Sequence, residues 1–178
     1  MSVIQFDPFN DRLSRDIRNG LSTSLTTCLK EMSIIPAMEI AKSFDPASLP
    51  ACYQDYINNR LNMYRIAIDK TAVTEDDPLC QAVILWDLQL FFEVHEVLEH
   101  AWLKADGDKK LILQALIRAA GAYIKQEFGA LSPATRLAEK AVTVLNQHKM
   151  FLAPYFDPDT LIQALQDVTR AAPKLGKE

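Results

Sequence analysis

The sequence predicts an all-α protein, built as a single-domain bundle of about six to seven helices. Apolar residues recur at every third or fourth position along most of the chain, which is the period of a buried helix face. No convincing run alternates apolar and polar residues, and only five glycines occur among the 178 residues. Hydrophobic residues make up 49% of the chain, so a packed core is expected.

Proline and polar residues set the bounds of the first three expected helices. Pro50 suits the first position of a helix, and the preceding stretch, residues 43–50, reads as a loop. The three helices are expected at residues 10–32, 36–42 and 50–69. Tyr53, Ile57, Leu61 and Tyr64 share one face of the third helix. Because such a face is not left in water, residues 1–75 are expected to pack as a helical extension on the rest.

A second helical part is expected at residues 76–172, after an acidic connector at residues 71–78. Its first helix is expected to run unbroken from Pro78 to about Ala105. The helices that follow start at the N-cap candidate Asp108, at Ser132-Pro133 and at Asp157-Pro158. Their expected spans are residues 108–128, 133–148 and 158–171. Residues 173–178 are expected to be a frayed tail.

Charge and composition exclude several classes of partner. The net charge of -4 argues against nucleic acid, which requires a basic surface. No basic block suits a membrane surface, and the longest apolar stretch, residues 82–94, is interrupted by polar residues. The start of the chain lacks the pattern of a signal peptide, and its three cysteines form no CxxC pair. A cytoplasmic location with reduced thiols is expected, and a homo-oligomer stays open.

His95 and Glu99 are the polar exceptions on an apolar face of the expected central helix. At about 100° per residue they lie beside Phe92, Leu98 and Trp102, so we expect both to be buried, with Trp102 as a core anchor. The pair is either a buried hydrogen bond that orients packing or a nitrogen and an oxygen ligand for one metal ion. The neighbouring His100 does not complete a zinc-protease motif, because the histidines are five residues apart.

The next helix offers counter-charges for Glu99. Gln114, Arg118, Gly121 and Lys125 share one of its faces, and Gly121 would admit another helix closely. Counting outward from a turn near residue 107, we expect Arg118 or Gln114 to meet Glu99 first and Lys125 second. The alternative is an ordinary solvated polar face.

At these residues the chain resembles the bacterial and archaeal domain of unknown function 309. The resemblance rests on H-x-x-x-E-x-x-W at His95, Glu99 and Trp102, on the preceding Phe91-Phe92-Glu93, and on the block Leu113-Gln114-Ala115-Leu116-Ile117-Arg118-Ala119-Ala120. It covers roughly residues 79–168 and implies a helical fold with a candidate metal-binding motif and no established activity. Lys125 stands where the family often has histidine, which removes a ligand.

Three functions are compatible with these residues. The first is a binding or structural module with a buried His95-Glu99-Trp102 network. The second is a metal-binding protein that uses His95 and Glu99. The third is an enzyme, such as a hydrolase using His95 and a carboxylate for acid-base or metal-assisted chemistry. Catalytic residues are not identified. No cofactor and no tightly bound transition metal are expected, with a divalent metal as the alternative.

Overall fold

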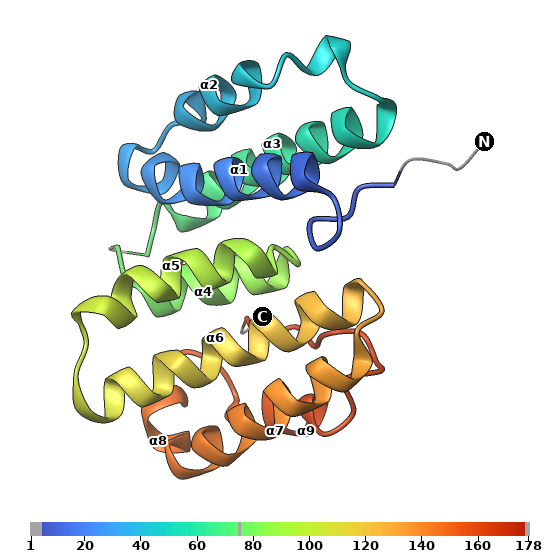
Figure 1. Cartoon of the computed structure of the whole chain (residues 1–178). Coiled ribbons are helices and arrows are strands. Elements are labelled where there is room, and N and C mark those ends of the chain that lie inside the picture. The colour runs from blue at the N-terminus through green and yellow to red at the C-terminus, as the bar shows by residue number, and fades with distance from the viewer. Residues whose placement is uncertain (1–4, 75, 177–178) are drawn as a thin grey trace. The chain divides into compact units, whose positions relative to one another are not determined.

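A computed structural model describes residues 5–74 and 76–176, which are helical and contain no strand (Figure 1). The all-α prediction is therefore confirmed. The described residues form nine α-helices and one short 3-10 helix, against the six to seven helices expected. None of the helices in these residues is both long and apolar enough to cross a membrane. The helices are α1 (Arg12–Glu31), α2 (Ile35–Ser43), η1 (Pro46–Ser48), α3 (Ala51–Thr71), α4 (Pro78–Asp87), α5 (Phe91–Lys104), α6 (Gly107–Glu127), α7 (Leu131–Gln147), α8 (Lys149–Leu152) and α9 (Pro158–Leu165).

The chain divides into two compact units, residues 1–73 and residues 74–178. In the first unit, α1 packs against α2 and α3. Gly20 allows the approach of α2, because a Cβ atom there would lie 3.0 Å from the Ile40 side chain. Asp11 caps α1 by accepting a hydrogen bond from the Ser14 backbone, and the Tyr53 hydroxyl of α3 donates to the same carboxylate. The packing of residues 1–75 on the rest of the chain stays a prediction.

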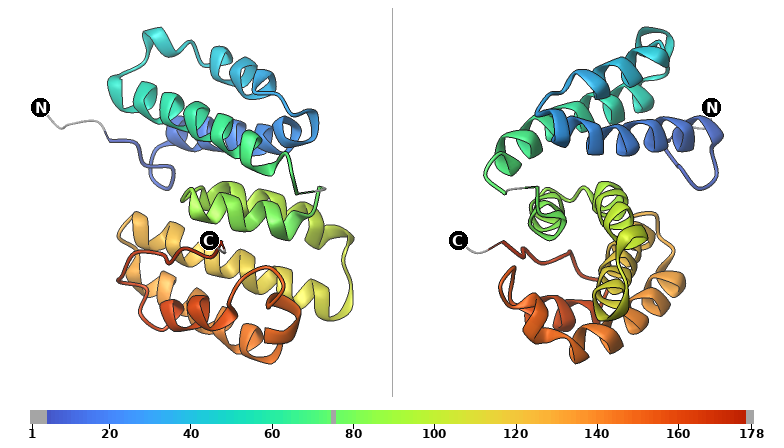
Figure 2. Two further views of the ribbon diagram at one scale, coloured as in Figure 1. Left: turned by 180° about the vertical axis from the view of Figure 1, so that it is seen from behind. Right: turned by 90° about the vertical axis from the view of Figure 1, so that its left-hand side faces the viewer.

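The second unit is built around α6, which lies between α5 and α7 (Figure 2). The α7 side of α6 carries Gly121, where a Cβ atom would lie 3.4 Å from Leu137. Gly121 therefore faces α7, but a Cβ atom there would make an ordinary contact, so the helix approach does not depend on glycine. Helix α4 packs on α5, and α9 packs on α7. Asp157 caps α9 and Pro158 opens it, as the sequence predicts.

The prediction of one unbroken helix over residues 78–105 is wrong. Helix α4 ends at Asp87, and α5 begins at Phe91. Gln89 between them has a left-handed backbone, with φ of 58°. The Leu90 N–H donates to the Leu85 carbonyl at 2.9 Å, and the Gln89 N–H donates to the Trp86 carbonyl at 2.8 Å. This is the Schellman pattern that ends a helix, and it is usually formed by glycine, so the sequence did not reveal it.

The last residues also differ from the prediction. Helix α9 ends at Leu165 instead of near residue 171, and the short helix α8 was not expected. Residues 173–176 are not frayed, because hydrogen bonds hold them against the end of α4. Residues 177 and 178 lie outside the described part of the chain.

Candidate functional site

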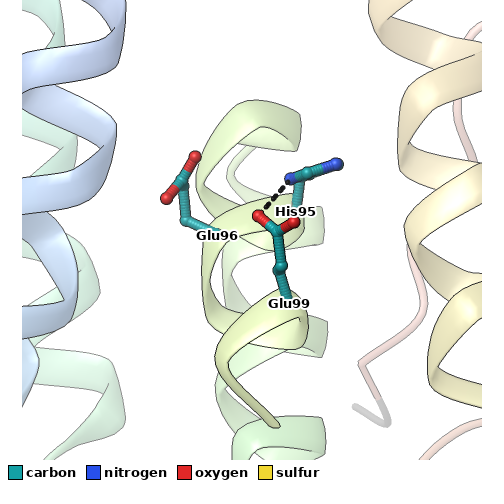
Figure 3. A group of neighbouring side chains, drawn as sticks. All are labelled: His95, Glu96 and Glu99. Atoms are coloured by element: carbon teal, nitrogen blue, oxygen red, sulfur yellow. Dashed lines mark ion pairs between the residues drawn. The ribbon is translucent and has the colours of Figure 1, made fainter. Parts of the chain in front are cut away.

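Helix α5 brings His95 and Glu99 together. The two residues are four apart and are therefore neighbours on the helix surface. The His95 Nδ1 atom lies 3.7 Å from the Glu99 Oε2 atom, and the two side chains point toward each other (Figure 3). This part of the sequence prediction is confirmed.

The pair is not buried, which corrects the prediction. The side chains of His95 and Glu99 are 37% and 48% exposed. Helix α5 turns Phe91, Val94, Val97 and Leu98 into the core, so His95 and Glu99 lie at the edge of the buried face. The helical wheel placed both residues correctly on the side of Phe92 and Leu98, but it could not show that the buried face of α5 ends before His95 and Glu99.

Glu96 is a third polar group beside this pair, and together we call His95, Glu96 and Glu99 the α5 cluster. One ligand atom from each of the three residues lies within 4.8 Å of the others. Figure 3 shows the Glu96 carboxylate directed to one side of the His95–Glu99 pair. Glu96 was not among the residues singled out from the sequence, because at about 100° per residue it lies on the polar stripe of the helix.

The α5 cluster has the chemistry of a divalent metal site. Imidazole nitrogen and carboxylate oxygen both bind zinc at about 2.0–2.2 Å, so two ligands of one ion lie at most about 4.3 Å apart. The 3.7 Å separation of His95 and Glu99 meets this limit. Glu96 has a ligand atom within 4.8 Å of the other two, so its side chain has to rotate to join them on one ion.

The side chains expected from α6 do not meet Glu99. Gln114, Arg118 and Lys125 are all half-buried. Within the described residues, Glu99 forms no hydrogen bond or ion pair with any of them, and the side chain next to its carboxylate is His95. Because Glu99 is exposed, water solvates its carboxylate and no buried donor is required.

Trp102 is not the core anchor that the motif suggested. It is half-buried, and the Lys110 ammonium lies 4.5 Å from its ring centroid. Its place in the last turn of α5 puts it next to the turn into α6 instead of inside the unit. The buried tryptophan is Trp86, whose ring makes edge contacts with Phe91 and Tyr123.

A buried carboxylate of α5 and a buried hydroxyl of α6 were missed by sequence reasoning. Glu93 is fully buried in the first turn of α5, where the positive end of the helix dipole favours a carboxylate. Tyr123 is 1% exposed, and burial raises its pKa to about 12. Glu93 had a signal, since it follows the aromatic pair at the true start of α5.

Comparison with known protein families bears on the same helices. Residues 79–137 match the family model of the Domain of unknown function (DUF309). The resemblance predicted from the motif is thereby confirmed over α4, α5 and α6, while the expected extension to residue 168 lies beyond the match. No curated protein and no solved structure matches the chain. We call the matched residues, 79–137, the DUF309 segment. It contains the whole α5 cluster, and the family description assigns it no activity.

Proposed function

We propose that the DUF309 segment is a metal-binding module that holds one exchangeable divalent transition-metal ion at the α5 cluster. The observation that carries the proposal is the pairing of His95 Nδ1 and Glu99 Oε2 at 3.7 Å on the surface of α5. A buried polar network, the other function considered, requires both groups to be shielded from water. Because both side chains are exposed, this condition is not met, and there is room for an ion with its own water ligands.

The ligand types favour a borderline metal. Imidazole suits zinc, iron and nickel, and two carboxylates extend the range to manganese. Calcium and magnesium are disfavoured, because both prefer oxygen ligands throughout. We therefore take zinc as the first probe and magnesium as the probe for selectivity.

The expected affinity is modest. Structural zinc sites use four enclosed ligands and reach binding free energies of about 10–16 kcal/mol. The α5 cluster offers three ligands from a single helix, and the side chains of His95 and Glu99 are 37% and 48% exposed. We expect a dissociation constant on the order of 10 μM, which corresponds to about 7 kcal/mol. Such an ion is lost during purification and returns when zinc is supplied.

Isothermal titration calorimetry of the full chain with zinc tests this function. We expect one site per chain, with binding weakened at least about tenfold in His95→Ala and in Glu99→Gln. Glu96→Gln should weaken binding less, because its carboxylate must rotate to reach the ion. Acidic pH should weaken binding, because a protonated imidazole has no lone pair for the metal.

His100→Ala is the matched control, because His100 is an exposed histidine on the same helix but outside the cluster. It should bind zinc as the native chain does. Equal loss in His100→Ala and His95→Ala, or no saturable binding by the native chain, would overturn the proposal. Magnesium binding as tight as zinc binding would also contradict it.

A further inference from the structure

Residues 172–176 run alongside the end of α4 in the second unit and are held there by specific hydrogen bonds. The Trp86 indole N–H donates to the Pro173 carbonyl at 2.9 Å. The backbone N–H groups of Leu175 and Gly176 donate to the two carboxylate oxygens of Asp87 at 2.7 and 2.9 Å. The Lys174 ammonium donates to the Asp87 carbonyl. Two adjacent residues of α4 therefore bind three backbone groups of the segment, together with one ammonium.

One side chain anchors the segment in the core. Leu175 is 6% exposed, whereas its neighbours Lys174 and Gly176 are exposed. Together with residues of α4, α5 and α6, Leu175 lines an apolar cavity of about 20 Å³, which also includes Trp86 and Phe156. The free volume is small, so the leucine side chain nearly fills the space available to it.

The glycine directly after this leucine lies close against Asp87. A Cβ atom at Gly176 would lie 2.7 Å from the Asp87 Oδ2 atom, closer than non-bonded contacts allow. The same oxygen accepts the Gly176 N–H, so the carboxylate cannot move away without losing that bond. A larger residue at this position requires the Asp87 carboxylate to shift, so the contact favours glycine.

The contacts that hold the segment do not depend on the rest of this chain. These contacts recognise a backbone carbonyl, a leucine side chain two residues later and then a glycine. Any extended segment with this pattern offers the same groups, as in other modes of peptide recognition that combine main-chain bonds with one side-chain pocket. Lys174 contributes to the binding of the segment only through its exposed side chain, which donates to the Asp87 carbonyl.

The stretch that connects the segment to α9 carries few buried groups, and the Gln126 side chain of α6 donates hydrogen bonds to its Thr169 and Arg170 carbonyls. Between the end of α9 and residue 172, only Val168 is buried among residues 166–171. A stretch with so few buried groups opens locally without unfolding the helices to which it is attached. Its release would uncover Asp87, the Trp86 indole N–H and the leucine cavity together.

We propose that the end of α4 is a peptide-recognition groove for an extended carbonyl-x-Leu-Gly segment of a partner protein, and that residues 172–176 occupy this groove as an internal competitor. Tethering gives the internal segment an effective concentration in the millimolar range for a short flexible linker. A partner segment therefore binds when the internal segment is weakened or displaced. This proposal is independent of metal binding at the α5 cluster.

A fluorescent peptide with the sequence of residues 171–176 and an amidated end tests the groove by anisotropy in the full chain. The native chain should bind it weakly, because the internal segment competes. The Gly176→Ala and Leu175→Asp chains, each with a weakened internal segment, should bind it at least about tenfold more tightly. Adding Asp87→Ala to either chain should abolish this gain, whereas adding Glu139→Ala, an exposed carboxylate of α7, should not.

A peptide with alanine in place of its glycine is the specificity control and should bind at least about tenfold more weakly. Circular dichroism verifies that each variant keeps its helices. Trp86 emission in a Trp102→Phe background should shift to longer wavelength when the internal segment is released. The proposal is overturned if the released, helical variants bind the peptide no better than the native chain, or bind both peptides equally.

Discussion

Tyr123 places a hydroxyl group in the core of the second unit, where none of the described residues accepts its hydrogen bond. Its ring is well packed, stacking on Phe91 with centroids 5.5 Å apart and meeting Trp86 edge-on. A buried donor without a partner loses its bonds to water and gains nothing in exchange. The hydroxyl therefore lowers stability while the ring raises it.

Tyr123→Phe isolates the effect of this hydroxyl. We expect the free energy of unfolding at neutral pH to stay unchanged or to rise by up to about 1 kcal/mol. Tyr155→Phe is the control in the same unit, because the Tyr155 hydroxyl donates to Asp77 at 3.2 Å, and it should lower stability by about 1 kcal/mol. Urea unfolding followed by circular dichroism measures both, and a loss above about 1 kcal/mol in Tyr123→Phe would contradict the assignment.

Alkaline pH should separate the native chain further from Tyr123→Phe. Burial raises the pKa of folded Tyr123 from 10.0 to about 12, so between these values the folded chain keeps a proton that the unfolded chain releases. Stability is then lost as the pH rises through this window, by about 1.4 kcal/mol per pH unit. The variant lacks this loss, so its advantage over the native chain should widen above pH 10.

At the scale of elements, the break between α4 and α5 determines where the polar residues of the DUF309 segment lie. The Schellman turn at Gln89 ends α4 and lets α5 begin afresh, with Glu93 in its first turn and the α5 cluster at the edge of its buried face. Leu85 and Leu90, which flank this turn, are both fully buried. The apolar contact between them is the usual companion of such a turn.

Gln89→Gly should stabilise this turn. Gln89 is exposed and adopts φ of 58°, a conformation that costs a residue with a Cβ atom about 1 kcal/mol relative to glycine. We expect the free energy of unfolding to rise by up to about 1 kcal/mol. The same replacement at His100, an exposed position inside α5, should instead lower it by about 1 kcal/mol. A destabilised Gln89→Gly chain would show that the Gln89 side chain supports the turn.

Helix positions were predictable wherever caps and prolines mark them. Asp157 and Pro158 gave the start of α9, and the spacing of apolar residues gave α1, α3, α6 and α7 to within a few residues. The end of α4 was not predictable, because Gln89 has no special tendency toward a left-handed backbone. The contact of His95 with Glu99 followed from their spacing alone, whereas their exposure depended on the orientation of α5, which the break sets.

At the scale of the whole molecule, the chain consists of two compact helical units, and the DUF309 match lies in the second. The first unit buries Ile57 and Tyr64 of α3, two residues of the face that had suggested packing on the rest. The docking of residues 173–176 on Trp86 and Asp87 joins positions 87 to 89 residues apart. No local sequence signal reports such a contact, because it depends on the arrangement of α4, α5, α6 and α9.

Anomalous X-ray diffraction from crystals grown with zinc locates a divalent metal ion bound at the α5 cluster. We expect one strong anomalous peak, within about 2.2 Å of both the His95 Nδ1 atom and a Glu99 carboxylate oxygen. The peak should be absent from crystals of the His95→Ala chain grown in the same way. An anomalous map with no peak at His95 and Glu99, or with zinc bound only at His100 or His148, would contradict the claim.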